Sequence, residues 1–147
     1  MAFWRWRNVP LPEPDLGGLS VGLVAHAFVG WKLLGASWLG HAIGWPLLTF
    51  GLAIVVWAVI AASDADMHVP NFVISDGPYR YSRNPMYIGW MFVYVGVAFI
   101  VNTAWPLVLL PPVLLLIHWT VTREERELEQ RLGVEYVRYL ARTRRYV

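Results

Sequence analysis

The stretch GPYRYSRNPMYIGW, residues 77–90, joins a polar, turn-rich segment directly to a long apolar run. It holds two arginines, an asparagine and three tyrosines at the point where an apolar helix is expected to begin. Helix N-termini favour anions because their first backbone N–H groups have no partner within the helix. The stretch therefore predicts a membrane helix whose entrance carries ligand-binding groups.

The composition of the chain is that of a membrane protein. Of its 147 residues, 57% are hydrophobic and only 15% are charged, and the mean hydropathy is +0.46. Soluble domains carry about 25% charged residues, so we expect residues 1–147 to form a single integral membrane domain. The absence of cysteine excludes disulfides, thiolate zinc sites and a cysteine nucleophile. No metal site is expected, because the histidines are scattered, at His26, His41, His68 and His118.

Four apolar segments are long enough to cross a bilayer, which takes about 20 residues in a helix. The predicted fold class is all-α and integral to the membrane. Its elements are a C-terminal cytoplasmic amphipathic helix at 122–142 and four transmembrane helices, at 19–38, 44–62, 85–102 and 105–121. The first span contains Lys32, whose side chain is expected to reach toward the far interface. Pro111 and Pro112 lie inside the fourth, where they indicate a packing kink or the wall of a pocket.

Positive charge lies at the N-terminus, in the loop between the second and third spans, and at the end of the chain, where seven arginines follow Thr122. This distribution is typical of cytoplasmic membrane flanks and not of a nucleic-acid surface. We therefore expect both termini and the polar loop 63–84 in the cytoplasm, in a bacterial inner membrane. The expected partner is the lipid bilayer, and the sequence indicates no oligomeric state.

This topology brings two polar clusters together. The third and fourth spans form a hairpin that returns the chain to the same side of the membrane. Glu124 and Glu125 should therefore lie near Arg83, Asn84 and Tyr87. Carboxylates bind ammonium groups, arginine binds carboxylates, and aromatic rings stack on heterocycles or face cations. S-Adenosylmethionine, which has an amino acid head, a sulfonium and an adenine, is a plausible ligand for such a site.

Each of these groups also has an ordinary structural interpretation. The arginines and tyrosines fit anchors at a membrane interface, and Asn84 before Pro85 fits the first turn of a helix. Glu124 and Glu125 fit acids that complement a helix dipole. His118 is interpreted as a packing histidine rather than a proton-transfer group. None of these interpretations requires the clusters to converge, so their convergence favours a binding site.

The two motifs, GPYRYSRNPMYIGW and REERELEQRLGVEYVRYLARTRRYV, resemble those of integral membrane methyltransferases over residues 75–147. This group contains the isoprenylcysteine carboxyl methyltransferases and the phospholipid N-methyltransferases. The resemblance implies S-adenosylmethionine as the methyl donor, with one of the paired glutamates on its amino group. The donor-binding positions that it implies are Tyr79, Arg80, Tyr81, Arg83, Asn84, Pro85, Tyr87, Gly89, Glu124 and Glu125. Many relatives have histidine where this chain has Asn84, whose amide can hydrogen-bond but cannot act as a base.

The implied reaction is an in-line displacement at the sulfonium methyl, without a metal. We assign the catalytic positions to Arg83, Asn84 and Tyr87. Orienting the reactants is the expected contribution of the protein, about 7–11 kcal/mol in well-aligned systems. The acceptor is a lipophilic or small molecule with a carboxylate, an amine or a thiol. Two alternatives remain: an NADPH-dependent membrane reductase of the sterol-reductase type, and a non-catalytic membrane scaffold.

Overall fold

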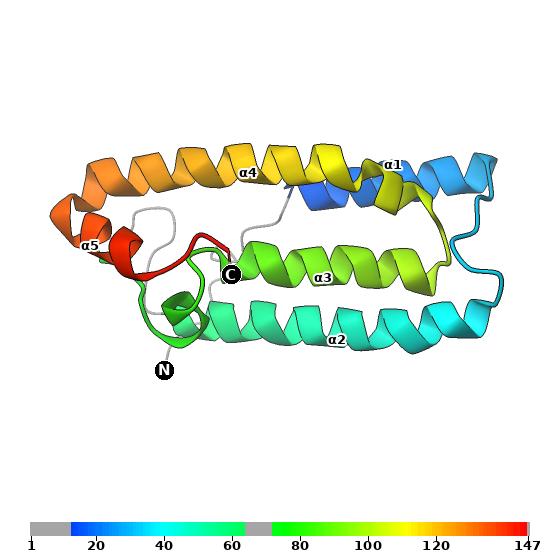
Figure 1. Cartoon of the computed structure of the whole chain (residues 1–147), viewed down its shortest axis with the longest axis horizontal. Helices are drawn as coiled ribbons and strands as arrows, with labels where there is room; N and C mark the ends of the chain where they lie inside the picture. Colours follow the sequence, from blue (N-terminus) through cyan, green and yellow to red (C-terminus); the bar gives the residue numbers. More distant parts are fainter. Residues whose placement is uncertain (1–12, 64–71, 147) are drawn as a thin grey trace.

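Four helices run side by side along the length of the molecule, and a fifth crosses one end (Figure 1). The computed structural model describes residues 13–63 and 72–146. The N-terminal arginines and part of the predicted loop, residues 64–71, lie outside this range. The described elements, which include no β-strand, are α1 (Glu13–Phe28), α2 (Ser37–Ala61), the 3-10 helix η2 (Gly77–Arg80), α3 (Pro85–Ile100), α4 (Trp105–Leu132) and α5 (Val134–Arg142).

Helices α2 and α3 form the most closely packed pair. A Cβ atom added to Gly51 of α2 would lie 2.5 Å from the carbonyl oxygen of Gly89 of α3. Further along, a Cβ atom added to Gly96 would lie 2.9 Å from the carbonyl oxygen of Gly44. Small residues let two helix backbones approach this closely. Gly89, a predicted donor-binding position, therefore lies in a helix interface.

Helix α4 packs along α1 more extensively than along α3. Gly22 of α1 lies against Pro106 of α4, where an added Cβ atom would be 3.0 Å from the proline ring. Tyr94 of α3 is fully buried, and its hydroxyl donates a hydrogen bond of 2.7 Å to the carbonyl oxygen of Pro106. This bond ties α3 to the start of α4. Between these helices, nearer the other end of the bundle, a cleft remains.

The predicted first span, residues 19–38, is wrong at its boundaries. Helix α1 ends at Phe28, and α2 begins at Ser37 rather than near residue 44. The intervening segment leaves the helical path because its backbone bonds to the α3–α4 connection. The amide of Asn102 accepts from Leu34 N at 2.8 Å and donates to Leu34 O at 2.9 Å, and Trp31 O accepts from Ala104 N at 3.0 Å.

Asn102→Ala should lower the stability of the bundle by about 1–3 kcal/mol, because it removes the partners of both Leu34 backbone groups. Asn102 also has a left-handed backbone with φ +55°, which asparagine tolerates better than alanine. Asn102→Gly removes the same bonds without this strain, so it should recover only part of the loss. The measurement is the midpoint of thermal unfolding in detergent. Equal midpoints for wild type and both variants would contradict the role given to Asn102.

The predicted C-terminal helix, residues 122–142, is not a separate helix. Helix α4 continues without a break from Trp105 to Leu132, because nothing near Val121 interrupts helical hydrogen bonding. The break comes at Gly133, which has φ +57° and leads into the amphipathic helix α5. Such a left-handed backbone favours glycine.

Two helices, α2 and α4, are long and apolar enough to cross a membrane. Only 22% of the apolar window of each is buried inside the bundle, whereas the core helix of a soluble protein is mostly buried. Helix α3 is apolar but has 16 residues, about 24 Å of helix, against a hydrocarbon core of about 30 Å. Helix α1, also 16 residues long, does not qualify as a span. Within residues 13–63 and 72–146, the structure therefore supports membrane association with two candidate spans, and it does not confirm the four predicted ones.

Candidate active site

A charged cluster lies where the polar half of α4 passes over the start of α3. It is made by Arg83, Asn84, Glu124 and Glu125 and is completed by Arg145. At its centre is Glu125, whose side chain is only 9% exposed. Its Oε1 lies 3.2 Å from Arg83 Nη1 and accepts from Asn84 Nδ2 at 3.5 Å. Its Oε2 accepts from Arg145 Nε at 2.9 Å and lies 2.8 Å from Arg145 Nη2. The predicted convergence of the two motifs is present, and both oxygens of Glu125 are already paired.

The last residues of the chain complete this cluster. Beyond α5 the chain turns back and lies beside the start of α3 (Figure 1). Arg83 N donates to Arg144 O at 2.9 Å, and Arg145 O accepts from Asn84 Nδ2 at 3.1 Å and Ser82 Oγ at 3.3 Å. These bonds hold Arg145 over Glu125. Arg145 was not among the predicted site residues, and its only sequence signal was membership of the basic C-terminal run.

Asn84 occupies the residue before α3, but its side chain makes no capping hydrogen bond. Pro85 begins the helix, as the sequence predicts, and needs no N–H partner in the first turn. The amide of Asn84 instead donates into the charged cluster. Asn84 therefore precedes the first turn of α3, as predicted, while its side chain bonds within the charged cluster rather than to the helix.

Glu124 differs from Glu125 in its surroundings. It is exposed, and its Oε1 accepts a hydrogen bond of 3.0 Å from the hydroxyl of Tyr87. Its Oε2 has no partner among the described residues. Arg83 Nε is buried and likewise has no partner in the described part of the chain. Among the described residues, the cluster thus offers one unpaired carboxylate oxygen, on Glu124, and one unpaired guanidinium N–H group, on Arg83.

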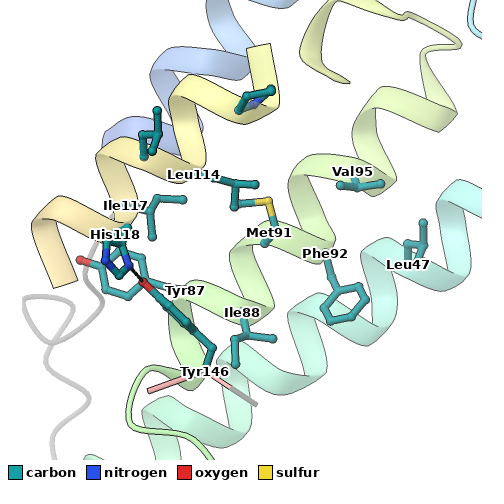
Figure 2. A pocket seen from close by; sticks show the side chains of 12 residues that line it. Leu47, Tyr87, Ile88, Met91, Phe92, Val95, Leu114, Ile117, His118 and Tyr146 are labelled. Carbon is teal, nitrogen blue, oxygen red and sulfur yellow. Dashed lines mark hydrogen bonds between the residues drawn. The ribbon is translucent and has the colours of Figure 1, made fainter. Parts of the chain in front are cut away.

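A cleft of about 740 Å³ lies between α3 and α4 and reaches α2. Apolar side chains make most of its wall, and polar groups gather at one end, as Figure 2 shows. Its lining residues are Leu47, Tyr87, Ile88, Met91, Phe92, Val95, Pro111, Leu114, Leu115, Ile117, His118 and Tyr146. Pro111 lies in the wall, in agreement with one of its two predicted roles. Tyr87 links the cleft to the charged cluster, because its ring lines the cleft and its hydroxyl bonds to Glu124.

The polar end of the cleft holds a pair that the sequence did not reveal. The Nδ1 atom of His118 lies 3.2 Å from the phenolic oxygen of Tyr146 (Figure 2). Burial raises the pKa of Tyr146, so its phenol stays neutral near neutral pH. Tyr146 follows Arg145 directly, and the backbone bonds that hold Arg145 also bring this ring to the cleft.

The other predicted donor-binding residues lie outside the cluster and the cleft. Arg80 and Tyr81 are exposed, and the side chain of Tyr79 is buried against α2. Pro85 and Gly89 are buried parts of α3. The structure thus brings together Arg83, Asn84, Tyr87, Glu124 and Glu125, and it adds Ser82, His118, Arg145 and Tyr146.

Comparison with known protein families gives one match. Residues 39–134, well over half of the chain, match the family described as phospholipid methyltransferase. The matched range runs from α2 through α4 and contains the whole of the first motif, residues 77–90, but only the first part of the second motif, up to residue 134. This family is one of the two groups of methyltransferases that the motifs resemble, the phospholipid methyltransferases. Comparison with curated proteins and with solved structures gives no match.

Proposed function

The chain belongs to the phospholipid methyltransferase family, and we propose that it transfers a methyl group from S-adenosylmethionine to the head group of a membrane lipid. One observation carries the proposal: the charged cluster of Arg83, Asn84, Glu124 and Glu125 opens through Tyr87 onto an apolar cleft. A water-soluble, zwitterionic donor and an apolar acceptor require these two environments next to each other.

The free atoms of the cluster match the amino acid head of the donor. Glu124 Oε2 is available to an ammonium group, and Arg83 Nε is a buried donor that a carboxylate would satisfy. The rings of Tyr87 and Tyr146 are available to a cation or a flat heterocycle. When bound, S-adenosylmethionine supplies a methyl group on sulfonium sulfur that a nucleophile displaces.

Glu125 has a different part in this proposal. Two guanidinium groups and an amide already surround its carboxylate. We therefore assign it to positioning Arg83, Asn84 and Arg145, and we assign the binding of the donor's ammonium to Glu124. Holding these groups rigid is the means by which the chain orients the reactants.

The cleft supports a lipid acceptor. Its apolar wall, which includes Leu47 of α2 and Leu115 of α4, suits acyl chains. Leu115 is strongly exposed, so acyl chains can enter the cleft from the bilayer side of α4. The head group then lies at the polar end beside Tyr87, His118 and Tyr146. A phospholipid head group that accepts methyl groups carries an amine, and we propose this class over a carboxylate or a thiol.

For the orientation, we propose that α1 to α4 all insert, with the charged cluster at the cytoplasmic face of a bacterial inner membrane. The four helices run alongside one another, and the arginine-rich end of α4 lies at the same end of the bundle as the start of α3 (Figure 1). The arginine excess at this end supports a cytoplasmic position.

The proposal is tested by titrating the purified protein in detergent with S-adenosylmethionine, S-adenosylhomocysteine and NADPH. Saturable binding of the first two alone is expected. Binding of NADPH alone would instead support a reductase, and binding of none of the three would support a scaffold.

Glu124→Gln is expected to weaken binding of S-adenosylmethionine by about 10- to 100-fold, because a charge-assisted hydrogen bond contributes about 1.5–3 kcal/mol. The thermal unfolding midpoint should change little, since Glu124 is exposed and, among the residues that the structure describes, bonds only to Tyr87. Isothermal titration measures the first quantity and a thermal melt the second. Glu129→Gln, an exposed substitution further along α4, is the matched control and should bind like wild type. Unchanged affinity in Glu124→Gln would refute the assignment of this carboxylate.

A further inference from the structure

We infer that His118 and Tyr146 form a proton-accepting pair for the acceptor amine, with His118 as the catalytic base and Tyr146 as a positioning residue. The inference rests on the proposed function and deepens it. It gives a role to the C-terminal segment, whose last described residue reaches the cleft.

The geometry of the pair supports these roles. Both side chains line the polar end of the cleft, and their ring centroids lie 6.2 Å apart (Figure 2). The Nδ1 atom of His118 faces the phenolic oxygen of Tyr146 at 3.2 Å, while Nε2 has no partner among the residues that the structure describes. A phenolic hydroxyl can accept from Nδ1–H or donate to a bare Nδ1, and the inference uses the tautomer in which Nδ1 carries the proton. When Nδ1–H donates to Tyr146, Nε2 keeps the lone pair that accepts a proton.

Tyr146 is held in place by contacts that do not involve the cleft. The preceding carbonyl, Arg145 O, accepts from Asn84 Nδ2 and Ser82 Oγ, and the Arg145 side chain is paired with Glu125. The charged cluster therefore fixes the position of the phenol that contacts His118. No separate lid or loop is needed for this coupling.

Several other titratable groups surround this end of the cleft. Helix α2 contributes only apolar Leu47 to the wall. Asp15 of α1 and Glu124 of α4 interact electrostatically with Tyr87 of α3. Glu125 of α4 and Arg145 of the C-terminal segment interact with Tyr146. Glu125 is paired with Arg145, and Tyr87 with Glu124, and among the described residues that line the cleft His118 is the one whose ring nitrogen can accept a proton.

The chemistry requires such a base. An alkylamine resembling the lysine side chain has a pKa of about 10.4. Almost all of it is therefore protonated at neutral pH, and the protonated nitrogen has no free lone pair. In the proposed step, an N–H proton of the ammonium moves to His118 Nε2 and leaves an imidazolium. The freed nitrogen then bonds to the methyl carbon as the carbon–sulfur bond of the donor breaks, with its electron pair remaining on sulfur. The exposed imidazolium returns its proton to solvent.

The first test measures methyl transfer to phosphatidylethanolamine in mixed micelles from about pH 6 to about pH 9. His118→Gln should lower the rate by about 10²- to 10⁴-fold at the low end, and the deficit should shrink as the amine deprotonates by itself. Tyr146→Phe should lower it by about tenfold, with a changed pH profile and unchanged affinity for S-adenosylmethionine. His41→Gln, an exposed substitution on α2 away from the cleft, is the matched control and should behave like wild type.

The second test does not depend on turnover. Nitrogen NMR of labelled histidine in the full-length protein reports which ring nitrogen carries the proton, and the His118 signals are those lost in His118→Gln. The expected result is a predominant Nδ1–H form in wild type and a loss of this preference in Tyr146→Phe. A predominant Nε2–H form in wild type would overturn the inference.

Failure of the inference is distinguishable from failure of the proposed function. If the wild-type protein does not bind S-adenosylmethionine, both fall. If it methylates a prenylated cysteine carboxylate but not phosphatidylethanolamine, it is a methyltransferase and the inference is wrong. If it methylates phosphatidylethanolamine and His118→Gln has the same rate and pH profile, the inference alone is wrong.

Discussion

Gly51→Leu is expected to yield no folded protein after extraction into detergent. The first side-chain atom would lie 2.5 Å from the carbonyl oxygen of Gly89, 2.9 Å from Phe92 Cβ and 2.9 Å from Val93 N. Two of these three atoms belong to the α3 backbone, which cannot rotate away as a side chain would. Overpacking in a tight core costs about 1–3 kcal/mol even where side chains can adjust. Here the α2–α3 pair must separate, and we expect the loss to exceed that range.

The measurement is the monodisperse fraction in size-exclusion chromatography, together with the thermal unfolding midpoint. Gly17→Ala in α1 is the matched control, because an added Cβ atom at Gly17 meets nothing within 4 Å. Alanine is favoured over glycine in a helix by about 0.5–1 kcal/mol, so this variant should be at least as stable as wild type. Wild-type behaviour of Gly51→Leu would show that α2 and α3 do not approach as closely as described.

The sequence predicted correctly those features that single residues determine locally. Pro85 marks the start of α3, because proline fits the first helical turn. The controlling residue lies at the feature itself, so no knowledge of distant contacts was needed.

The first predicted span was wrong because a distant contact, and not a local residue, determines where its helix ends. Apolar composition continues beyond Phe28, and a hydropathy pattern therefore extends the helix to residue 38. The chain instead turns, because Leu34 bonds to Asn102, which is 68 residues away in sequence. Asn102 has a left-handed backbone at the α3–α4 connection. A partner so distant leaves no local signal near residue 34.

Some residues of the candidate site could be placed from the sequence, and others could not. Arg83, Asn84 and Glu125 could be placed together because a hairpin returns the chain to one side, whatever the details of packing. Arg145 and Tyr146 could not, because their position depends on the turn at Gly133 and on backbone bonds to residues 82–84. The sequence also could not distinguish the two glutamates, since only the structure shows that Glu125 is paired on both oxygens.

Glu125→Gln should destabilise the protein by about 3 kcal/mol, the low end of the range for breaking a buried ion pair. It removes the negative charge between Arg83, which is 14% exposed, and Arg145, which is 35% exposed and keeps part of its hydration. The thermal unfolding midpoint measures this loss. Glu127→Gln is the matched control on the same helix, because Glu127 pairs with Arg123 in an exposed i,i+4 contact that contributes about 0.3–0.5 kcal/mol.

Glu125→Gln should also weaken binding of S-adenosylmethionine, although Glu125 is not assigned to contact it. Loss of the carboxylate frees Arg145, and with it the segment that holds Asn84 and Tyr146 in place. A direct ligand and a positioning residue differ in their coupling, which a double-mutant cycle with Arg145→Gln measures. If Glu125 acts through Arg145, the double variant should bind the donor about as weakly as Glu125→Gln alone. If the two losses of binding energy simply add, Glu125 acts independently of the C-terminal segment, and the division of roles between the two glutamates is wrong.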